Sequence, residues 1–219
     1  MLLEPASSVT DFALGVLAIG AAILVQRNEQ AHHHWRLTFL IIGFAAILGG
    51  VHHGFIDPDG RTGAVSWAII SLTIAVAISF LLSATIASVL GEGRARPLLV
   101  IRGVSLFAFF ILVILGRASI LTLVITEGLA MIMVVLLWLH AWRLEQPGAG
   151  LVLFAIGASV LAAVVRGSSA HVTLGWEFDT NALYHLAQMP GIILLYVAVR
   201  RLGRRSPSMA TLRQSRALQ

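Results

Sequence analysis

The sequence predicts an all-α, polytopic membrane protein, a bundle of seven transmembrane helices. Of its 219 residues, 58% are hydrophobic and only 11% are charged. Soluble domains have about 45–50% apolar and about 25% charged residues. The mean hydropathy is +0.91. Seven segments also have the roughly 20 mostly apolar residues that a spanning helix needs. These observations exclude a water-soluble globule and a disordered chain.

The predicted spans follow one another along the chain with short turns between them. They cover residues 9–26, 37–56, 64–90, 97–115, 118–142, 149–170 and 180–201. Gly, Pro and acidic residues at 57–60, 91–93 and 146–148 favour turns. The weakest division is at Gly116 and Arg117, between the fourth and fifth spans. The first run lacks a basic leader and a small-residue cleavage site, so we expect it to be a retained span.

The distribution of arginine predicts the orientation of the bundle. One side carries eleven arginines and three glutamates, and the other carries two arginines and six acidic residues. The positive-inside rule places the arginine-rich side in the cytoplasm. We therefore expect a bacterial inner-membrane protein with its N-terminus outside and its C-terminus cytoplasmic. Residues 1–202 form the seven-helix domain, and residues 203–219 form a basic, disordered tail near anionic lipid headgroups.

The composition also limits the chemistry and the partners. The chain has no cysteine, which excludes disulfides, thiolate metal sites, iron–sulfur clusters and cysteine nucleophiles. All 15 basic residues are arginine, so no lysine can form a Schiff base with retinal. The net charge of +5 reflects topology and does not indicate a nucleic-acid partner. We expect membrane lipids as partners, and the chain as a homo-oligomer or as a subunit of a larger complex.

Several ionisable groups fall inside the predicted spans, where each is a functional candidate because its burial in a bilayer is costly. The predicted topology gathers groups from four helices into one outer layer. They are His52 and His53 at the end of the second span, Glu127 in the fifth, Arg166 near the end of the sixth with His171 beyond it, and His185 in the seventh.

The seventh span has the clearest polar pattern. Asn181, His185 and Gln188 are spaced i, i+4 and i+7, which places them on one face of a helix. Pro190 follows and predicts a kink, because proline cannot donate a backbone hydrogen bond. This stripe fits either the wall of a polar cavity or a set of hydrogen bonds that tie helices together.

A metal site is one way to use these residues. A catalytic zinc takes about three nitrogen or oxygen ligands and a water. His53, or His52 in its place, could act with His185 and Glu127. The supporting residues could be Asn181, Gln188, Asp57 or Asp59. Glu127 is then the predicted general base, and Asp57 is the second predicted catalytic carboxylate. Glu127 could instead pair with Arg166, and two histidines could be the axial ligands of a haem.

The chain resembles the membrane hydrolase superfamily of the alkaline ceramidases and the progestin and adipoQ receptors. The resemblance covers the seven-span topology and two residues, His53 (or His52) and His185. It implies a zinc held by one histidine of the second helix and an HxxxH pair of the seventh. Asn181 stands at the first histidine of that pair, and Gly49 or Leu48 stands at a serine of the family. The chain also resembles uncharacterised bacterial seven-span proteins with a similar Asn-x-x-[Tyr/Phe]-His-Leu-x-Gln stretch.

Three functions follow as expectations. The first is a divergent metal-dependent lipid hydrolase with an outward-facing pocket, in which the metal lowers the pKa of bound water. The second is a non-enzymatic binding, sensing or transport module or a complex subunit, and the third is a haem protein.

Overall fold

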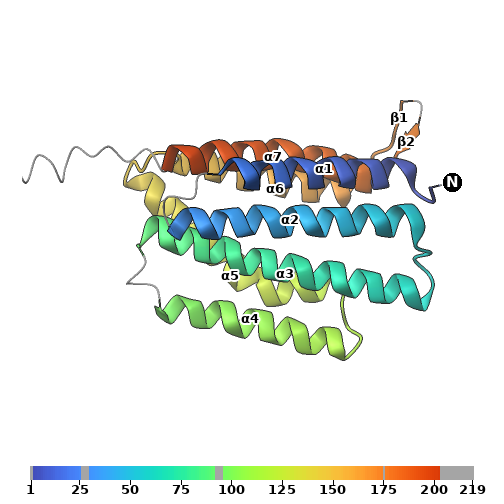
Figure 1. Ribbon diagram of the computed structural model, residues 1–219, viewed down its shortest axis with the longest axis horizontal. Coiled ribbons are helices and arrows are strands. Elements are labelled where there is room, and N and C mark those ends of the chain that lie inside the picture. Colours follow the sequence, from blue (N-terminus) through green and yellow to red (C-terminus); the bar gives the residue numbers. More distant parts are fainter. Residues whose placement is uncertain (1, 26–29, 92–95, 175, 203–219) are drawn as a thin grey trace, which may run out of the picture.

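The structure, a computed structural model, describes residues 2–25, 30–91, 96–174 and 176–202. Over these residues the chain forms seven helices and one two-stranded antiparallel hairpin (Figure 1). In chain order the elements are α1 (Pro5–Leu24), α2 (Gln30–Phe55), α3 (Arg61–Val89), α4 (Arg96–Ile114), α5 (Ile120–Arg143), α6 (Ala149–Arg166), β1 (Val172–Leu174), β2 (Trp176–Phe178) and α7 (Thr180–Leu202). The prediction of a seven-helix, largely helical chain is confirmed.

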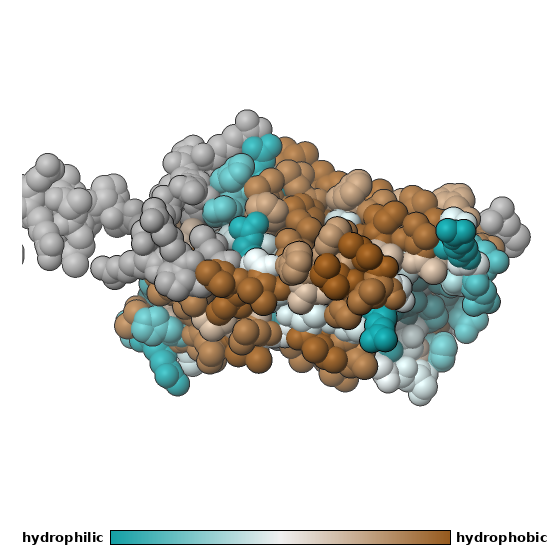
Figure 2. All heavy atoms as spheres, turned by 90° about the horizontal axis from the view of Figure 1, so that it is seen from below, coloured by the Kyte–Doolittle hydropathy of each residue, from teal (hydrophilic) through white to brown (hydrophobic). Residues whose placement is uncertain are grey.

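Six of the helices within the described ranges are long and apolar enough to cross a membrane. The exception is α4, whose apolar part, Val100–Ile114, is shorter. Large hydrophobic side chains are exposed on the outer faces of the helices, and Figure 2 shows them over the middle of one face, with hydrophilic residues toward the ends. The side of the membrane that each end faces stays a prediction, and the predicted tail at 203–219 lies outside the described residues.

The helices pack side by side along a common direction. α1 packs against both α2 and α7, α2 against α3, and α6 against α7, while α4 lies against α3 and α5 (Figure 1). Glycines bring α1 and α2 close together. A Cβ added at Gly43 would lie 2.7 Å from Cγ1 of Ile19, and one added at Gly15 would lie 2.7 Å from Cδ1 of Ile47. Only residues without a side chain allow this approach of the two backbones.

Two buried tryptophans pack together at the end of the bundle where α1 ends. Trp35 and Trp138 are fully buried, with ring centroids 6.2 Å apart. Their indole nitrogens donate to Ser88 Oγ at 3.0 Å and to Thr85 Oγ1 at 3.1 Å. A buried indole N–H needs such a partner. These contacts join α2, α3 and α5, and leave the polar groups described below at the opposite end.

The helix boundaries differ from the prediction by four residues or more at three places. α1 begins at Pro5, not at residue 9, because proline suits the first position of a helix. α2 begins at Gln30, so His32 to His34 lie in the helix and not in a loop. α6 ends at Arg166, four residues before the predicted end at residue 170, and the predicted connection to the seventh span contains a hairpin that was not predicted. Val172, Thr173 and Phe178 favour strands, which accounts for the hairpin in a segment predicted as a connection.

The predicted break between the fourth and fifth spans, at Gly116 and Arg117, is confirmed, because α4 ends at Ile114 and α5 begins at Ile120. Gly116 ends the turn after α4 with φ of +70°, a conformation that glycine adopts without strain. Ser119 then caps α5, accepting a hydrogen bond from the backbone nitrogen of Thr122 at 3.2 Å.

Candidate functional site

A buried carboxylate, Asp11, lies on α1 at the centre of the candidate site. The residue is only 5% exposed. It is buried against Gly49 of α2, where an added Cβ would lie 2.5 Å from Asp11 Oδ2. Glycine at this position therefore makes room for the carboxylate between the two helices. The close α1–α2 packing thus brings an ionisable group into the interior of the bundle.

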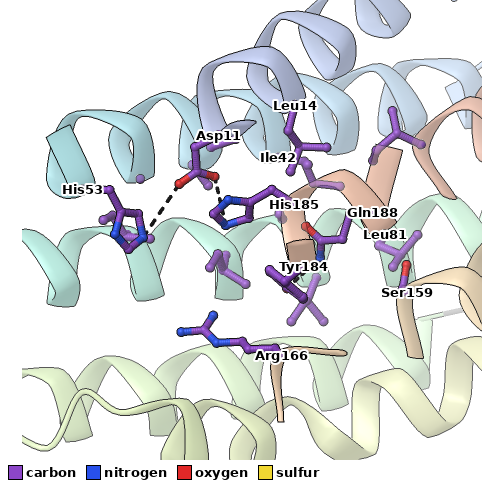
Figure 3. Close-up of a pocket in the computed structure, with 18 of the residues that line it drawn as sticks. Asp11, Leu14, Ile42, His53, Leu81, Ser159, Arg166, Tyr184, His185 and Gln188 are labelled. Carbon is purple, nitrogen blue, oxygen red and sulfur yellow. Dashed lines mark hydrogen bonds and ion pairs between the residues drawn. The ribbon is translucent and has the colours of Figure 1, made fainter. Parts of the chain in front are cut away.

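Two imidazoles from other helices converge on this carboxylate (Figure 3). His185 Nε2 of α7 lies 3.3 Å from Asp11 Oδ1, and His53 Nε2 of α2 lies 3.9 Å from Asp11 Oδ2. The centroids of the two rings are 6.1 Å apart. We call Asp11, His53 and His185 the carboxylate–imidazole cluster.

Each imidazole has a second partner on its other nitrogen. Glu4 Oε2 lies 2.6 Å from His53 Nδ1, and Thr10 Oγ1 lies 3.3 Å from His185 Nδ1. The Glu4 side chain is 42% exposed, the His53 side chain 13%, and the Asp11 and His185 side chains 7% each. The contacts therefore lead from the surface at one end of the bundle to a buried carboxylate.

The hydrogen-bond directions place one proton between Asp11 and His185. The Thr10 hydroxyl donates to the Ala6 carbonyl oxygen at 2.8 Å, so toward His185 it is an acceptor. His185 Nδ1 then carries the hydrogen, and a neutral ring leaves Nε2 without one. Without a hydrogen between them, the lone pair of His185 Nε2 would face a lone pair of Asp11 Oδ1 at 3.3 Å, and the two would repel each other. We therefore assign one proton to the Asp11–His185 pair.

A cavity of about 260 Å³ adjoins the cluster. Its polar lining comes from Asp11 and His53, from Ser159 and Arg166 on α6, and from Tyr184, His185 and Gln188 on α7. The rest of the lining is almost wholly apolar and is supplied by α1, α2, α3 and α7. Small-molecule sites have this character, an apolar wall with a few convergent polar groups.

Arg166 has a defined place in the cavity wall. Its guanidinium carbon lies 5.4 Å from the centroid of the Tyr184 ring, a cation–π contact. The Tyr184 hydroxyl accepts a hydrogen bond from Gln188 Nε2 at 2.6 Å. Among the described residues, Arg166 forms no ion pair with a carboxylate.

Four of the predicted site residues line this cavity: His53, Arg166, His185 and Gln188. Asn181, one turn before His185, is half-buried and is not part of the lining. His52 faces α3 instead, with Nδ1 3.2 Å from Ser66 Oγ and its ring centroid 6.2 Å from that of Trp67. Of the two adjacent histidines, His53 is therefore the one that lines the cavity.

Three further predicted residues lie away from the cavity. Glu127 on α5 is 2% exposed, does not line the cavity, and has Oε1 without a hydrogen-bond partner in the described chain. It forms no ion pair with Arg166. Asp57 is exposed in the α2–α3 turn and accepts from the Asp59 backbone nitrogen at 3.1 Å. His171 is exposed before the hairpin, 3.7 Å from Glu177.

The zinc site that the resemblance implies does not fit the described residues. Within them, no group of three or more histidine, aspartate or glutamate side chains could hold a metal ion. The predicted set is divided, because His52 and Glu127 do not line the cavity that His53 and His185 line. We therefore assign no chemical step to a metal here.

The central residue, Asp11, was not predicted as part of a site. It was counted with the charges of the outer surface because the first span was expected to begin at residue 9. A signal was present, since Ser7 and Ser8 lie four and three residues before Asp11, the spacings that bring side chains onto one helical face. Ser8 indeed bonds the Gly50 carbonyl of α2 at 2.8 Å, and Ser7 bonds Asp179 at 2.9 Å.

Comparison with known proteins gives one match. The model of a family described as a family of unknown function (DUF6962) matches residues 6–204. No curated protein and no solved structure matches the chain.

Proposed function

We propose that this chain, which belongs to the DUF6962 family of unknown function, binds a small, mostly apolar molecule within a membrane and exchanges a proton with it. One observation carries the proposal. A buried carboxylate, Asp11, contacts imidazoles from two other helices at the polar end of an otherwise apolar cavity.

The cost of this arrangement supports a function. Removing an ion from water costs several kcal/mol, even after the surroundings relax. Polar groups can tie helices together inside a membrane, but such ties need no cavity. The cavity beside the carboxylate–imidazole cluster therefore favours a ligand over a purely structural role.

The chemistry of the site would be acid–base chemistry. Asp11 and His185 hold one proton between them, at the wall of the cavity. A bound polar group in hydrogen-bond reach could take up that proton or add a second one. Glu4 and His53 form the route by which the proton is replaced from the end of the bundle. The arginine count predicts that this end faces the outside of a bacterial inner membrane.

Nuclear magnetic resonance of histidine labelled with nitrogen-15, on the protein in lipid nanodiscs, tests the proposal. We expect His185 to carry its hydrogen on Nδ1. Asp11→Asn should shift the His53 and His185 signals and leave that of the exposed His171 unchanged. Asp57→Asn, which removes an exposed carboxylate, is the matched control. A His185 signal that does not respond to Asp11→Asn would contradict the proposal.

A divergent metal-dependent lipid hydrolase is the second candidate. It is favoured by the convergence of His53 of the second helix and His185 of the seventh. Metal analysis of purified protein separates the two candidates. Stoichiometric zinc that is lost in His185→Ala would favour the hydrolase, and wild-type protein without bound metal favours the acid–base proposal. A Soret absorption band in the same sample would identify the haem alternative.

A further inference from the structure

We propose that the cavity takes an amphiphile with a single apolar chain and a carboxylate head, and that Arg166 contacts the head. This inference rests on the ligand site of the proposed function and names the class of its ligand. Three features of the cavity carry it: its length, the separation of its polar and apolar walls, and the unpaired charge of Arg166.

The cavity is long and narrow. Its wall on α3 runs from Trp67 to Leu81, which are fourteen residues apart. At about 1.5 Å per residue, this wall is roughly 21 Å long. The volume of about 260 Å³ is slightly below the range of about 300–1,000 Å³ that is usual for small-molecule sites. A space of this length and volume fits one extended chain better than a compact molecule or a two-chain lipid.

The polar and apolar parts of the wall are separated along that length. On α3 the lining consists of Trp67 followed by Ile, Ala and Leu side chains through Leu81. On α2 it passes from Ile42 at the apolar end to His53 at the polar end. The carboxylate–imidazole cluster lies at that polar end. A ligand that matches this wall has its head near His53 and its chain along α3.

The charge at the polar end favours an anionic head. Asp11 lies within ion-pair distance of two imidazoles, whereas Arg166 has an aromatic contact and, among the described residues, no carboxylate within ion-pair distance. Figure 3 shows Arg166 across the cavity from Asp11, so a head between them would lie beside the guanidinium. Guanidinium binds carboxylate through two parallel hydrogen bonds. A cationic head would instead be repelled.

A carboxylate head also suits the proton at the cluster. If the head takes the proton shared by Asp11 and His185, the head becomes a neutral acid, and the pair is left as carboxylate and neutral imidazole. The next proton then reaches Asp11 through Glu4 and His53. No bond other than those to the proton is made or broken, so no co-reactant is needed.

Fluorescence quenching tests the ligand class, because Trp67 lines the cavity. Brominated palmitate, added to protein in nanodiscs of neutral lipid, should quench wild-type emission and quench Trp67→Phe less. Unbrominated palmitate should compete with the quencher. Cetyl alcohol should compete at least about tenfold more weakly than palmitate. Cetylamine, inorganic phosphate and two-chain phosphatidic acid should not compete. Equal competition by palmitate and cetyl alcohol, or effective competition by phosphatidic acid, would overturn the proposal.

Substitution of Arg166 measures the contribution of the carboxylate head to binding separately from that of the apolar chain. Arg166→Gln should weaken palmitate about tenfold to a hundredfold, which is the worth of a hydrogen bond to a charged group. It should leave cetyl alcohol unchanged, which also shows that the variant is folded. Arg117→Gln, at an exposed arginine outside the cavity, is the matched control. Ile74→Trp, which fills the apolar wall, should weaken both ligands. Unchanged palmitate binding in Arg166→Gln would refute the role of Arg166.

The two proposals can fail separately. If palmitate does not bind but the His185 signal responds to Asp11→Asn, the ligand class is wrong and the acid–base site stands. If palmitate binds and His185 does not respond, the acid–base site is wrong and the cavity still has its ligand.

Discussion

At the scale of single residues, the site depends on how each polar atom is partnered. Three side chains stand out. Asp11 is placed by a glycine on the facing helix, His185 is oriented by the Thr10 hydroxyl, and His53 is held by Glu4. A buried imidazole that loses one partner can rotate or change tautomer, since the other nitrogen then determines where its hydrogen lies. The partners are therefore as important as the cluster itself.

The substitution Thr10→Val tests the assignment of the proton. Valine keeps the shape of threonine but removes the hydroxyl that lies 3.3 Å from His185 Nδ1, so the buried N–H loses this acceptor. We expect the free energy of unfolding to fall by about 1–3 kcal/mol. We also expect the histidine hydrogen to move to Nε2, facing Asp11, in the nitrogen-15 spectrum.

The control for this substitution is Thr73→Val on α3. That hydroxyl donates to the Ile69 carbonyl of its own helix and is exposed, so its loss should change neither stability nor the His185 signal. If Thr10→Val leaves the His185 tautomer as it is in the wild type, Thr10 does not orient the ring.

The sequence predicted part of the site at this scale, and the reason for the rest is physical. The residues His53, His185, Gln188 and Arg166 were identified because a polar group within an apolar run is conspicuous. Asp11 was not, because it lies close to the start of its run and could be read as a surface charge. Glu127 is just as conspicuous as His185, yet it does not line the cavity. Depth along a helix does not determine which way a side chain faces.

At the scale of elements, the approach of α1 to α2 positions Asp11. Gly15 and Gly43 allow the two backbones to meet, with the Gly43 carbonyl oxygen 3.0 Å from the position of a Cβ on Gly15. The same contact continues to Gly49, beside Asp11. A larger residue anywhere along this line would separate the helices and withdraw the carboxylate from the imidazoles.

We therefore expect Gly15→Leu to destabilise the protein by about 1–3 kcal/mol, the usual cost of overpacking a close contact. It should also displace Asp11, which the His53 and His185 signals would report. Gly20→Leu is the matched control on the same helix, because a Cβ there meets nothing within 4 Å. Equal stability of the two variants in reversible detergent unfolding would refute the close-packing account.

The spans were predictable because each is a long apolar run, and their order followed directly. The ends of the helices were less predictable. Pro5 extends α1 toward the N-terminus, and β-branched and aromatic residues form a hairpin in the connection between the sixth and seventh spans, where no element was expected. Both differences arise from local backbone preferences, which hydropathy does not report.

At the scale of the whole molecule, the two ends of the bundle have different roles. Buried tryptophans join three helices at one end, whereas the cavity and the carboxylate–imidazole cluster lie toward the other. The candidate site therefore lies nearer to one surface of the bundle than to the other. Which surface that is depends on the orientation that the arginines predict.

The absence of cysteine makes the orientation straightforward to test. Asp59→Cys places a single thiol in the exposed α2–α3 turn, near the cavity end, and Leu144→Cys places one after α5, at the other end. An impermeant maleimide added to intact cells should label the first and spare the second until the cells are opened. Labelling of Leu144→Cys alone would reverse the orientation.

The central claim is that one carboxylate lies between imidazoles of α2 and α7. Solid-state magnetic resonance can measure this proximity directly, through the dipolar coupling between carbon-13 in the Asp11 carboxyl group and nitrogen-15 in the histidine rings. We predict strong coupling to His185 Nε2, which lies 3.3 Å from Asp11 Oδ1, and weaker coupling to His53 Nε2 at 3.9 Å from Oδ2. Both couplings should vanish in Asp11→Asn prepared with unlabelled asparagine. Absence of coupling from Asp11 to either ring in the wild-type protein would contradict the account.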